Sequence, residues 1–178
     1  MKAAVLTKFG AIENAFEIKE VPNPTLNEGQ VLIETEGFGL NYADIMAIQG
    51  DYKECPPLPA IIGYDVVGKI KEIKGICGDL KIGDRVTAMS RFGGYAQFVV
   101  SESAACTVIK EDYELGKAMA LTTQYCTAYY CFNEVQSLYK GDTVLIHAAA
   151  GGVGTALVQM ALDKRLHCVW YLWIRRKN

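Results

Sequence analysis

Short apolar stretches separated by glycine and proline fill the chain up to about residue 109. Residues 16–21 alternate apolar and polar side chains with a period of two, which is typical of a half-buried β-strand, and Pro22 and Pro24 end that stretch. Strands are predicted at residues 3–6, 16–21, 30–35, 66–73, 85–89 and 95–100. Many short strands joined by such turns indicate a small barrel or sandwich.

Two local features add to this pattern. Gly68 lies inside a predicted strand, where the missing side chain indicates a bulge or the close approach of another backbone. Residues 42–48 have helical character, with Asn41 as the candidate N-cap and Gly50 as the stop. The N-terminal part is therefore expected to be β-rich with one short helix.

After residue 109 the apolar positions take helical spacing. Helices are predicted at residues 114–130, 134–138 and 155–162. Residues 142–147 form a continuous apolar strand of the kind buried in a parallel sheet, and residues 167–174 form a second candidate strand. The predicted fold class is α/β with a β-rich N-terminal part.

Composition narrows the function classes. The chain has 178 residues, of which 51% are hydrophobic and 21% charged, so it can build a core and is not disordered. A net charge of −2 without a basic stripe argues against nucleic acid as the partner. No apolar run reaches the length of a membrane span, and no signal peptide is evident, so a cytoplasmic protein is expected. The six cysteines form no CxxC pair, which favours incidental thiols over metal or disulfide chemistry.

A glycine-rich loop follows the strand at residues 142–147. Its sequence fits a dinucleotide-binding fingerprint with Ala149 in the first glycine position. Gly151 would let the backbone approach a pyrophosphate, and Gly154 would allow close helix–strand packing. The alternative is a tight strand–helix connection that binds no ligand. No acidic residue follows Asp163, and the chain ends in basic residues 175–177, which favours NADP over NAD unless those residues are a solvated tail.

Several motifs in a fixed order carry a family resemblance. They are Asn41-Tyr42-Ala43-Asp44, Gly50-Asp51-Tyr52, residues 63–68, Gly83-Asp84-Arg85-Val86, Gly94-Tyr95-Ala96 and residues 147–154. Over residues 1–163 the chain resembles the medium-chain dehydrogenase/reductase superfamily. The resemblance is to its zinc-independent quinone oxidoreductase branch, which includes zeta-crystallin-like proteins and vesicle amine transport protein homologues. This implies a GroES-like barrel at residues 1–119, followed by the beginning of a Rossmann domain at residues 120–178 that binds NADP(H).

The resemblance also assigns roles to individual residues. Zinc-dependent relatives have cysteine where Asn41 stands and histidine where Tyr64 stands, so no zinc is expected. Asn41 and Tyr52 are the implied catalytic hydrogen-bond donors, and Tyr42, Tyr52 and Tyr64 the implied substrate residues. Cofactor contacts are implied for Asn41, Thr127, Ala150, Gly151, Gly152, Val153 and Gly154. Asp65 stands where the family usually has glutamate.

Local sequence leaves other interpretations open. Asn41 can simply cap its helix, Tyr52 can be a surface aromatic, and Thr127 can be an interior helix residue. His147 is expected to pack rather than catalyse. Asp44 and the Asp84–Arg85 pair are expected to be structural, as a helix-face acid and a turn.

The implied activity is NADPH-dependent reduction of a quinone or an α,β-unsaturated carbonyl. A non-catalytic GroES-like association module is the alternative. Residues 164–178 lack the expected glycine and are unusually aromatic, so this tail is expected to be foreign to the family, from a truncation or a frameshift. A sheet of two strands would leave apolar faces exposed at Leu145, Ile146, Val169 and Leu172, which favours a homodimer or other self-association. Negligible NADPH binding and no quinone reduction are therefore expected of residues 1–178.

Overall fold

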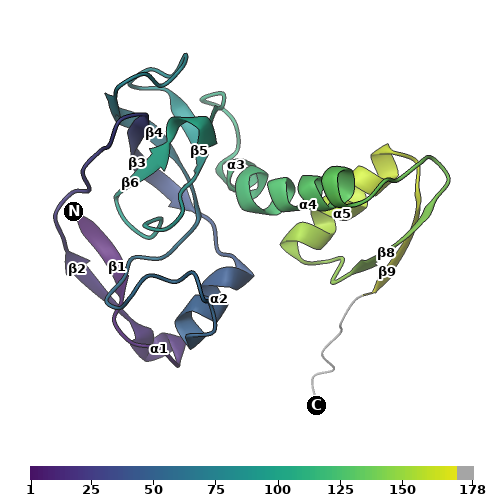
Figure 1. Ribbon diagram of the computed structural model, residues 1–178, viewed down its shortest axis with the longest axis horizontal. Helices are drawn as coiled ribbons and strands as arrows, with labels where there is room; N and C mark the ends of the chain where they lie inside the picture. Colours follow the sequence, from purple (N-terminus) through teal and green to yellow (C-terminus); the bar gives the residue numbers. More distant parts are fainter. Residues whose placement is uncertain (172–178) are drawn as a thin grey trace. The chain divides into compact units, whose positions relative to one another are not determined.

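A computed structural model describes residues 1–171 and divides the chain into two compact units, Met1–Thr122 and Thr123–Asn178 (Figure 1). The sequence predicts the boundary after residue 119. Leu172, the end of the strand expected at residues 167–174, and the basic residues 175–177 lie outside the described residues. Each unit is described by itself below.

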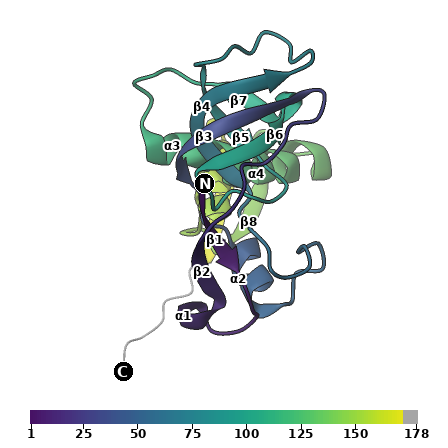
Figure 2. The same cartoon turned by 90° about the vertical axis from the view of Figure 1, so that its left-hand side faces the viewer.

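The first unit is built on an antiparallel sheet of five strands in the order β6-β3-β4-β5-β7 (Figure 2). A separate antiparallel pair, β1 with β2, is tied to the rest by bridges from Ala3 to Ala96 and from Leu6 to Ala60. The strands are β1 (Lys2–Leu6), β2 (Phe16–Glu20), β3 (Gln30–Phe38), β4 (Asp65–Lys74), β5 (Arg85–Met89), β6 (Phe98–Glu102) and β7 (Cys106–Val108). The β-rich N-terminal part is thereby confirmed. The strand expected at 95–100 instead begins at Phe98, and β7 was not predicted.

Alternating apolar side chains of these strands form the core of the sheet. Val31, Ile33, Val66, Ile70 and Val86 are fully buried in one cluster. Such burial is the main source of stability for a domain of this size.

Gly68 in β4 marks the close backbone approach that the sequence indicates. A Cβ on Gly68 would lie 2.1 Å from the carbonyl oxygen of Glu34 in β3, and the register between the two strands shifts nearby. The pairing of β3 with β4 at this point therefore requires a residue without a side chain.

Helices of the first unit are short. They are α1 (Ile12–Ala15), α2 (Tyr42–Gln49) and α3 (Leu115–Ala120), with a 3₁₀ turn η1 (Ser103–Ala105). Asn41 is the N-cap of α2 and Gly50 ends it with φ of 84°, as the sequence predicts. Ala47 and Ile48 of α2 pack on Leu6 and Ile62 in a second core cluster.

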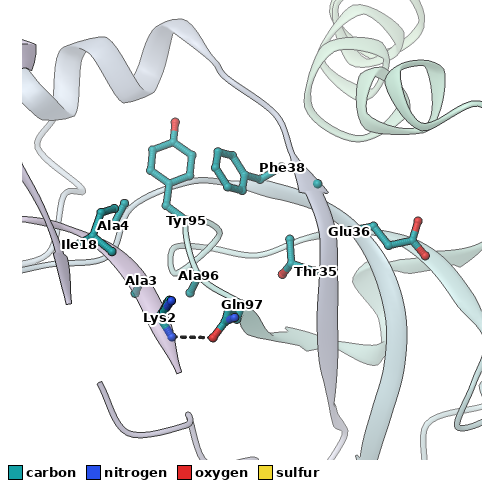
Figure 3. Close-up of a pocket in the computed structure, with 11 residues that line it drawn as sticks. Lys2, Ala3, Ala4, Ile18, Thr35, Glu36, Phe38, Tyr95, Ala96 and Gln97 are labelled. Carbon is teal, nitrogen blue, oxygen red and sulfur yellow. Dashed lines mark hydrogen bonds between the residues drawn. The ribbon is translucent and has the colours of Figure 1, made fainter. Parts of the chain in front are cut away.

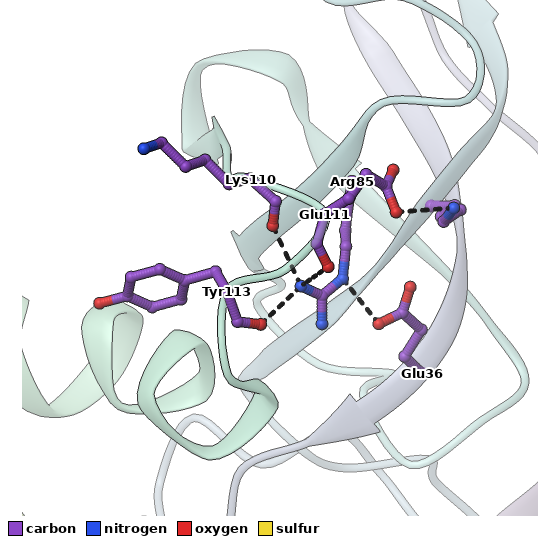
Figure 4. Close-up of polar contacts among 6 residues, drawn as sticks. Glu36, Arg85, Lys110, Glu111 and Tyr113 are labelled. Atoms are coloured by element: carbon purple, nitrogen blue, oxygen red, sulfur yellow. Dashed lines mark hydrogen bonds and ion pairs between the residues drawn. The ribbon is translucent and has the colours of Figure 1, made fainter.

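Arg85 joins β5 to the segment that leads into α3 (Figure 4). Its Nε donates to Glu36 at 2.9 Å. Its Nη1 donates to the carbonyl oxygens of Lys110, Glu111 and Tyr113 at 3.2, 3.1 and 2.7 Å. The expected Asp84–Arg85 turn is therefore only part of the role of Arg85, which is buried and pairs with Glu36.

The second unit contains a two-stranded parallel sheet with one long helix. Its elements are η2 (Leu121–Tyr125, shared with the first unit), α4 (Cys126–Tyr130), η3 (Cys131–Val135), β8 (Thr143–His147), α5 (Gly152–Asp163) and β9 (His167–Tyr171). η2 and η3 are π-helical turns, so the regular helix expected at 114–130 is wound unevenly, and the helix expected at 134–138 ends at Val135.

The two faces of the β8–β9 sheet are unequally covered. Ile146 is buried against Phe132, Ala161 and their neighbours. Leu145 and its strand partner Val169 are 59% and 51% exposed. The exposure expected of Leu145 and Val169 is confirmed, whereas the exposure expected of Ile146 is wrong, because Phe132 and Ala161 pack on that side chain. No helix within residues 1–171 combines the length and the apolar character needed to cross a lipid bilayer.

Candidate functional site

Asn41 lies between two buried carboxylates. Its backbone N–H donates to Oδ2 of Asp44 at 2.8 Å, as in a capping box. Its side-chain Nδ2 donates to Oδ1 of Asp65, the first residue of β4, at 2.8 Å. Asp44 and Asp65 are 2% and 1% exposed. Asn41 therefore caps α2 and also joins that helix to the sheet, while its catalytic role stays a prediction.

Asp44 is more than the helix-face acid that the sequence indicates. Burial raises the pKa of its carboxyl, and the nearby Asp65 adds to this, while the Asn41 N–H and the Tyr95 hydroxyl act in the opposite direction. Its Oδ1 is buried and accepts no hydrogen bond from the described residues. The sequence predicts a structural acid at Asp44, and its bond to the Asn41 N–H at the start of α2 agrees with that role; the sequence did not indicate that α2 presents this carboxyl to the interior.

Tyr64 and Tyr52 pack against each other, and Asp44 lies close enough to Tyr64 to affect it. Their rings meet edge to face with centroids 5.9 Å apart, and Phe92 lies 5.3 Å from Tyr64 on another side. The hydroxyl of Tyr64 is buried without a partner among the described residues. Burial raises the pKa of this phenol, and Tyr52 and Asp44 raise it further, so Tyr64 remains a neutral donor. Tyr52 is half-buried by this packing and is not a free surface aromatic.

Tyr42 differs from the other predicted tyrosines. It is 78% exposed at the first position of α2. The structure thus brings Tyr52 and Tyr64 together, with Asp44 close enough to act on Tyr64, while the side chain of Tyr42 lies in solvent. Its substrate role stays a prediction.

The glycine loop of the second unit connects β8 to α5. The turn falls at Ala148, which has φ of 50°, one residue earlier than the sequence predicts. A Cβ on Gly154 would lie 2.2 Å from the carbonyl oxygen of Ala148 and 2.7 Å from Cα of Ala149. Gly154 therefore permits the close helix–strand packing that the fingerprint predicts.

The first turn of α5 has N–H groups for which the helix itself supplies no acceptor. The first helical bond runs from the N–H of Thr155 to the carbonyl oxygen of Gly151 at 2.8 Å. Hence the N–H groups of Gly152, Val153 and Gly154 precede the helical ladder and have no acceptor within it. With the positive end of the helix dipole, they suit an anion. Ala150 and Gly151 are exposed beside them.

A further contact concerns the same loop. A Cβ on Gly152 would lie 2.5 Å from the side chain of Gln124, so Gln124 covers this glycine. No local signal in the sequence marks Gln124, because its partner lies 28 positions away. The hydroxyl of Thr127 donates to the carbonyl oxygen of Thr123 at 2.6 Å, and this back-bond occupies its proton. Its cofactor role stays a prediction. His147 is exposed and lies beside Tyr171, with ring centroids 6.3 Å apart.

A hollow of about 300 Å³ lies elsewhere in the first unit (Figure 3). Phe38 and Tyr95 form one wall, with ring centroids 4.7 Å apart, and β1 forms another. None of the residues predicted for the site lines it. Tyr95 lines this hollow and its hydroxyl also interacts with Asp44, so the hollow borders the residues that hold Asn41.

Comparison with known proteins agrees with this architecture. The profile of the alcohol dehydrogenase GroES-like domain matches residues 27–128. The human synaptic vesicle membrane protein VAT-1 homolog is 35% identical over 161 residues, which cover 90% of this chain and 41% of that protein. A probable quinone oxidoreductase of Schizosaccharomyces pombe is 36% identical over 152 residues, which cover 85% of this chain and 45% of that protein.

A solved structure extends the likeness to three dimensions. The quinone oxidoreductase from Thermus thermophilus, determined alone and in complex with NADPH, superposes with a TM-score of 0.81 at 32% identity. The match covers 96% of this chain and 52% of that one.

The β-rich first unit and the strand–loop–helix of the second define a chain of the medium-chain dehydrogenase/reductase superfamily, and it belongs to the family with the alcohol dehydrogenase GroES-like domain. Within the superfamily, it belongs to the quinone oxidoreductase branch. The chain spans about two fifths to one half of the length of these relatives.

Proposed function

We propose that this chain supplies the substrate domain and the first phosphate-binding loop of an NADPH-dependent reductase. The substrate class is a small quinone or an α,β-unsaturated carbonyl, and no zinc takes part. The observation that carries the proposal is the Asn41 amide, fixed as a hydrogen-bond donor where zinc-dependent relatives place a metal ligand. Support also comes from relatives that are quinone oxidoreductases, one of them solved with NADPH.

The second unit fits the pyrophosphate of the cofactor. The N–H groups at the start of α5 would donate to the phosphate oxygens, and the absence of a side chain at Gly151 would let the backbone come close. The cofactor, when bound, supplies the hydride. The preference for NADP over NAD rests on the basic residues 175–177, which lie outside the described residues.

The first unit would act on the substrate oxygen. A neutral amide at Asn41 and a phenol at Tyr52 can donate hydrogen bonds to an oxygen that gains negative charge during reduction. Tyr64 would line the substrate side with its ring, next to Tyr52. Asparagine and tyrosine are poor zinc ligands, so these donors would take the place of the Lewis acid. The purified protein is expected to contain no stoichiometric zinc, and about one zinc per chain in elemental analysis would contradict this.

A chimaera tests the proposal directly. Residues 1–163 replace the matching part of the Schizosaccharomyces pombe relative, and NADPH oxidation is followed with benzoquinone and with an enone. We expect turnover that Asn41→Ala reduces by about 10²-fold or more, as for other oxyanion donors. A folded chimaera that does not oxidise NADPH would overturn the proposal, and so would one that needs added zinc.

The 178-residue chain by itself should bind NADPH weakly. Within residues 1–171 the nucleotide-binding sheet has two strands, and sites of this kind form between several strand ends. Titration followed by NADPH fluorescence should show no saturation. A dissociation constant in the low micromolar range would contradict this.

A non-catalytic association module is the second candidate. The exposed face at Leu145 and Val169 favours it. Stable self-association of the chain, together with an inactive chimaera, would favour this candidate over the reductase.

A further inference from the structure

The hydrogen bond between Asn41 and Asp65 fixes which way the amide faces. A carboxylate can only accept, so the NH₂ group of Asn41 must face Asp65, and its carbonyl oxygen must face elsewhere. Because Asp65 is 1% exposed, little water competes for this bond. The backbone N–H of Asn41 is held separately by Asp44 at 2.8 Å. Carboxylates from α2 and β4 therefore hold the main chain and the side chain of one residue.

Gly39 makes room for the Asp65 carboxylate. A Cβ on Gly39 would lie 2.5 and 2.7 Å from the two carboxylate oxygens of Asp65. The N–H of Gly39 also donates to the main-chain carbonyl oxygen of Asp65 at 3.1 Å. The carboxylate is thus packed against the backbone of the segment that leads to Asn41 and cannot move toward it.

We propose that Asp65 is a positioning residue that sets the orientation of the Asn41 amide. One N–H of the amide is committed to Asp65, and the other remains for the oxygen of a substrate. The inference rests on the proposed function for the role of that second N–H. An asparagine at position 65 would lose the discrimination, because its own amide can present either a donor or an acceptor.

Side-chain amide NMR of the full 178-residue chain tests this. In the wild type, we expect the Nδ2 protons of Asn41 to exchange with solvent about tenfold or more slowly than those of the exposed Asn23, as a charge-assisted bond implies. Asp65→Asn should abolish that protection and shift the amide protons upfield. Asp44→Asn is the matched control, since it changes the other carboxylate by the same isosteric step. It should shift the backbone N–H of Asn41 and leave the side-chain protection in place.

Gly39→Ala is the second variant, because it keeps both carboxylates and displaces one. It should weaken the same protection. A folded Asp65→Asn protein with unchanged Asn41 amide signals would overturn the proposal. If that variant does not fold, wild-type Asn41 protons that exchange as fast as those of Asn23 would also overturn it. None of these measurements needs cofactor, so an inactive chimaera would refute the proposed function and leave this inference standing.

Discussion

Replacing Arg85 by methionine should destabilise the first unit more than any change at an exposed ion pair. Arg85 is 7% exposed and makes four hydrogen bonds, one of them to a carboxylate. Methionine has similar length but no donor, so Glu36 and three carbonyl groups lose their partner.

The size of the loss in stability depends on how well water can replace Arg85 as the hydrogen-bond donor to these partners. Glu36 is one third exposed, and the residues at 110, 111 and 113 are exposed, so water can replace part of the lost bonding. Breaking a fully buried pair costs about 3–5 kcal/mol, and rehydration places this case near the lower end, at about 3 kcal/mol. Arg85→Lys keeps the charge but cannot serve four acceptors, so it should lose about half as much.

Urea unfolding followed by circular dichroism measures the loss. Circular dichroism is used because residues 1–122 contain no tryptophan; both tryptophans are at positions 170 and 173. With a slope of about 1–3 kcal/mol per molar urea, a loss of about 3 kcal/mol shifts the midpoint by about 1–3 M. Arg91→Met is the control, because its ion pair with Glu54 is 82% exposed on the arginine side and should contribute less than about 1 kcal/mol. An Arg85→Met midpoint equal to that of Arg91→Met would refute the reasoning.

Three further predictions concern other parts of the chain. Gly154→Ala should destabilise the second unit by about 1–3 kcal/mol in tryptophan-detected unfolding. Gly151→Ala is the control and should cost clearly less, because its Cβ would stay 3.2 Å from its nearest neighbour. Equal losses in the two variants would contradict the packing argument. Because folding raises the pKa of Asp44, its contribution to stability is complete below pH about 4 and is lost as the pH rises through the folded pKa. Asp44→Asn should remove this decline from the pH dependence of the urea midpoint. Parallel pH profiles of the wild type and Asp44→Asn would disprove it. Leu145→Lys with Val169→Lys should reduce self-association in sedimentation velocity, and an unchanged profile would show that this face is not the contact.

The elements that the sequence predicts correctly are those set by neighbouring residues. Alternation marks β2, a continuous apolar run marks β8, and Asn41 with Gly50 brackets α2, because in each case the signal lies within a few positions. β7 has only three residues, Cys106–Val108, and its pairing with β5 is not visible in so short a segment. The π-helical turns were missed for a related reason, since helical spacing alone does not separate them from an α-helix.

The candidate site likewise contains parts that neighbouring residues predict and parts that depend on distant residues. The glycine loop could be predicted because strand, loop and helix are consecutive, and only the position of the turn, at Ala148, was displaced by one residue. The bond between Asn41 and Asp65 joins residues 24 positions apart, and Gln124 reaches Gly152 across a similar interval. Such contacts depend on how β4 and α5 are placed, which no local pattern determines. The family resemblance identifies Asn41, but the structure is needed to show what holds it.

A fixed orientation of the Asn41 side chain would matter more in the proposed site of neutral donors than in a metal site. A zinc ion attracts an oxygen from many directions, whereas an amide N–H must point at it to be useful. An asparagine that is free to turn would offer its carbonyl as often as its NH₂ group, and a carbonyl would repel a developing oxyanion. The buried carboxylate of Asp65 removes that freedom at the Asn41 side chain, at the cost of keeping Asp65 away from water, while Asp44 holds the Asn41 backbone N–H. If Asn41 acts as proposed, the fold gives up some stability to fix the direction of its amide N–H.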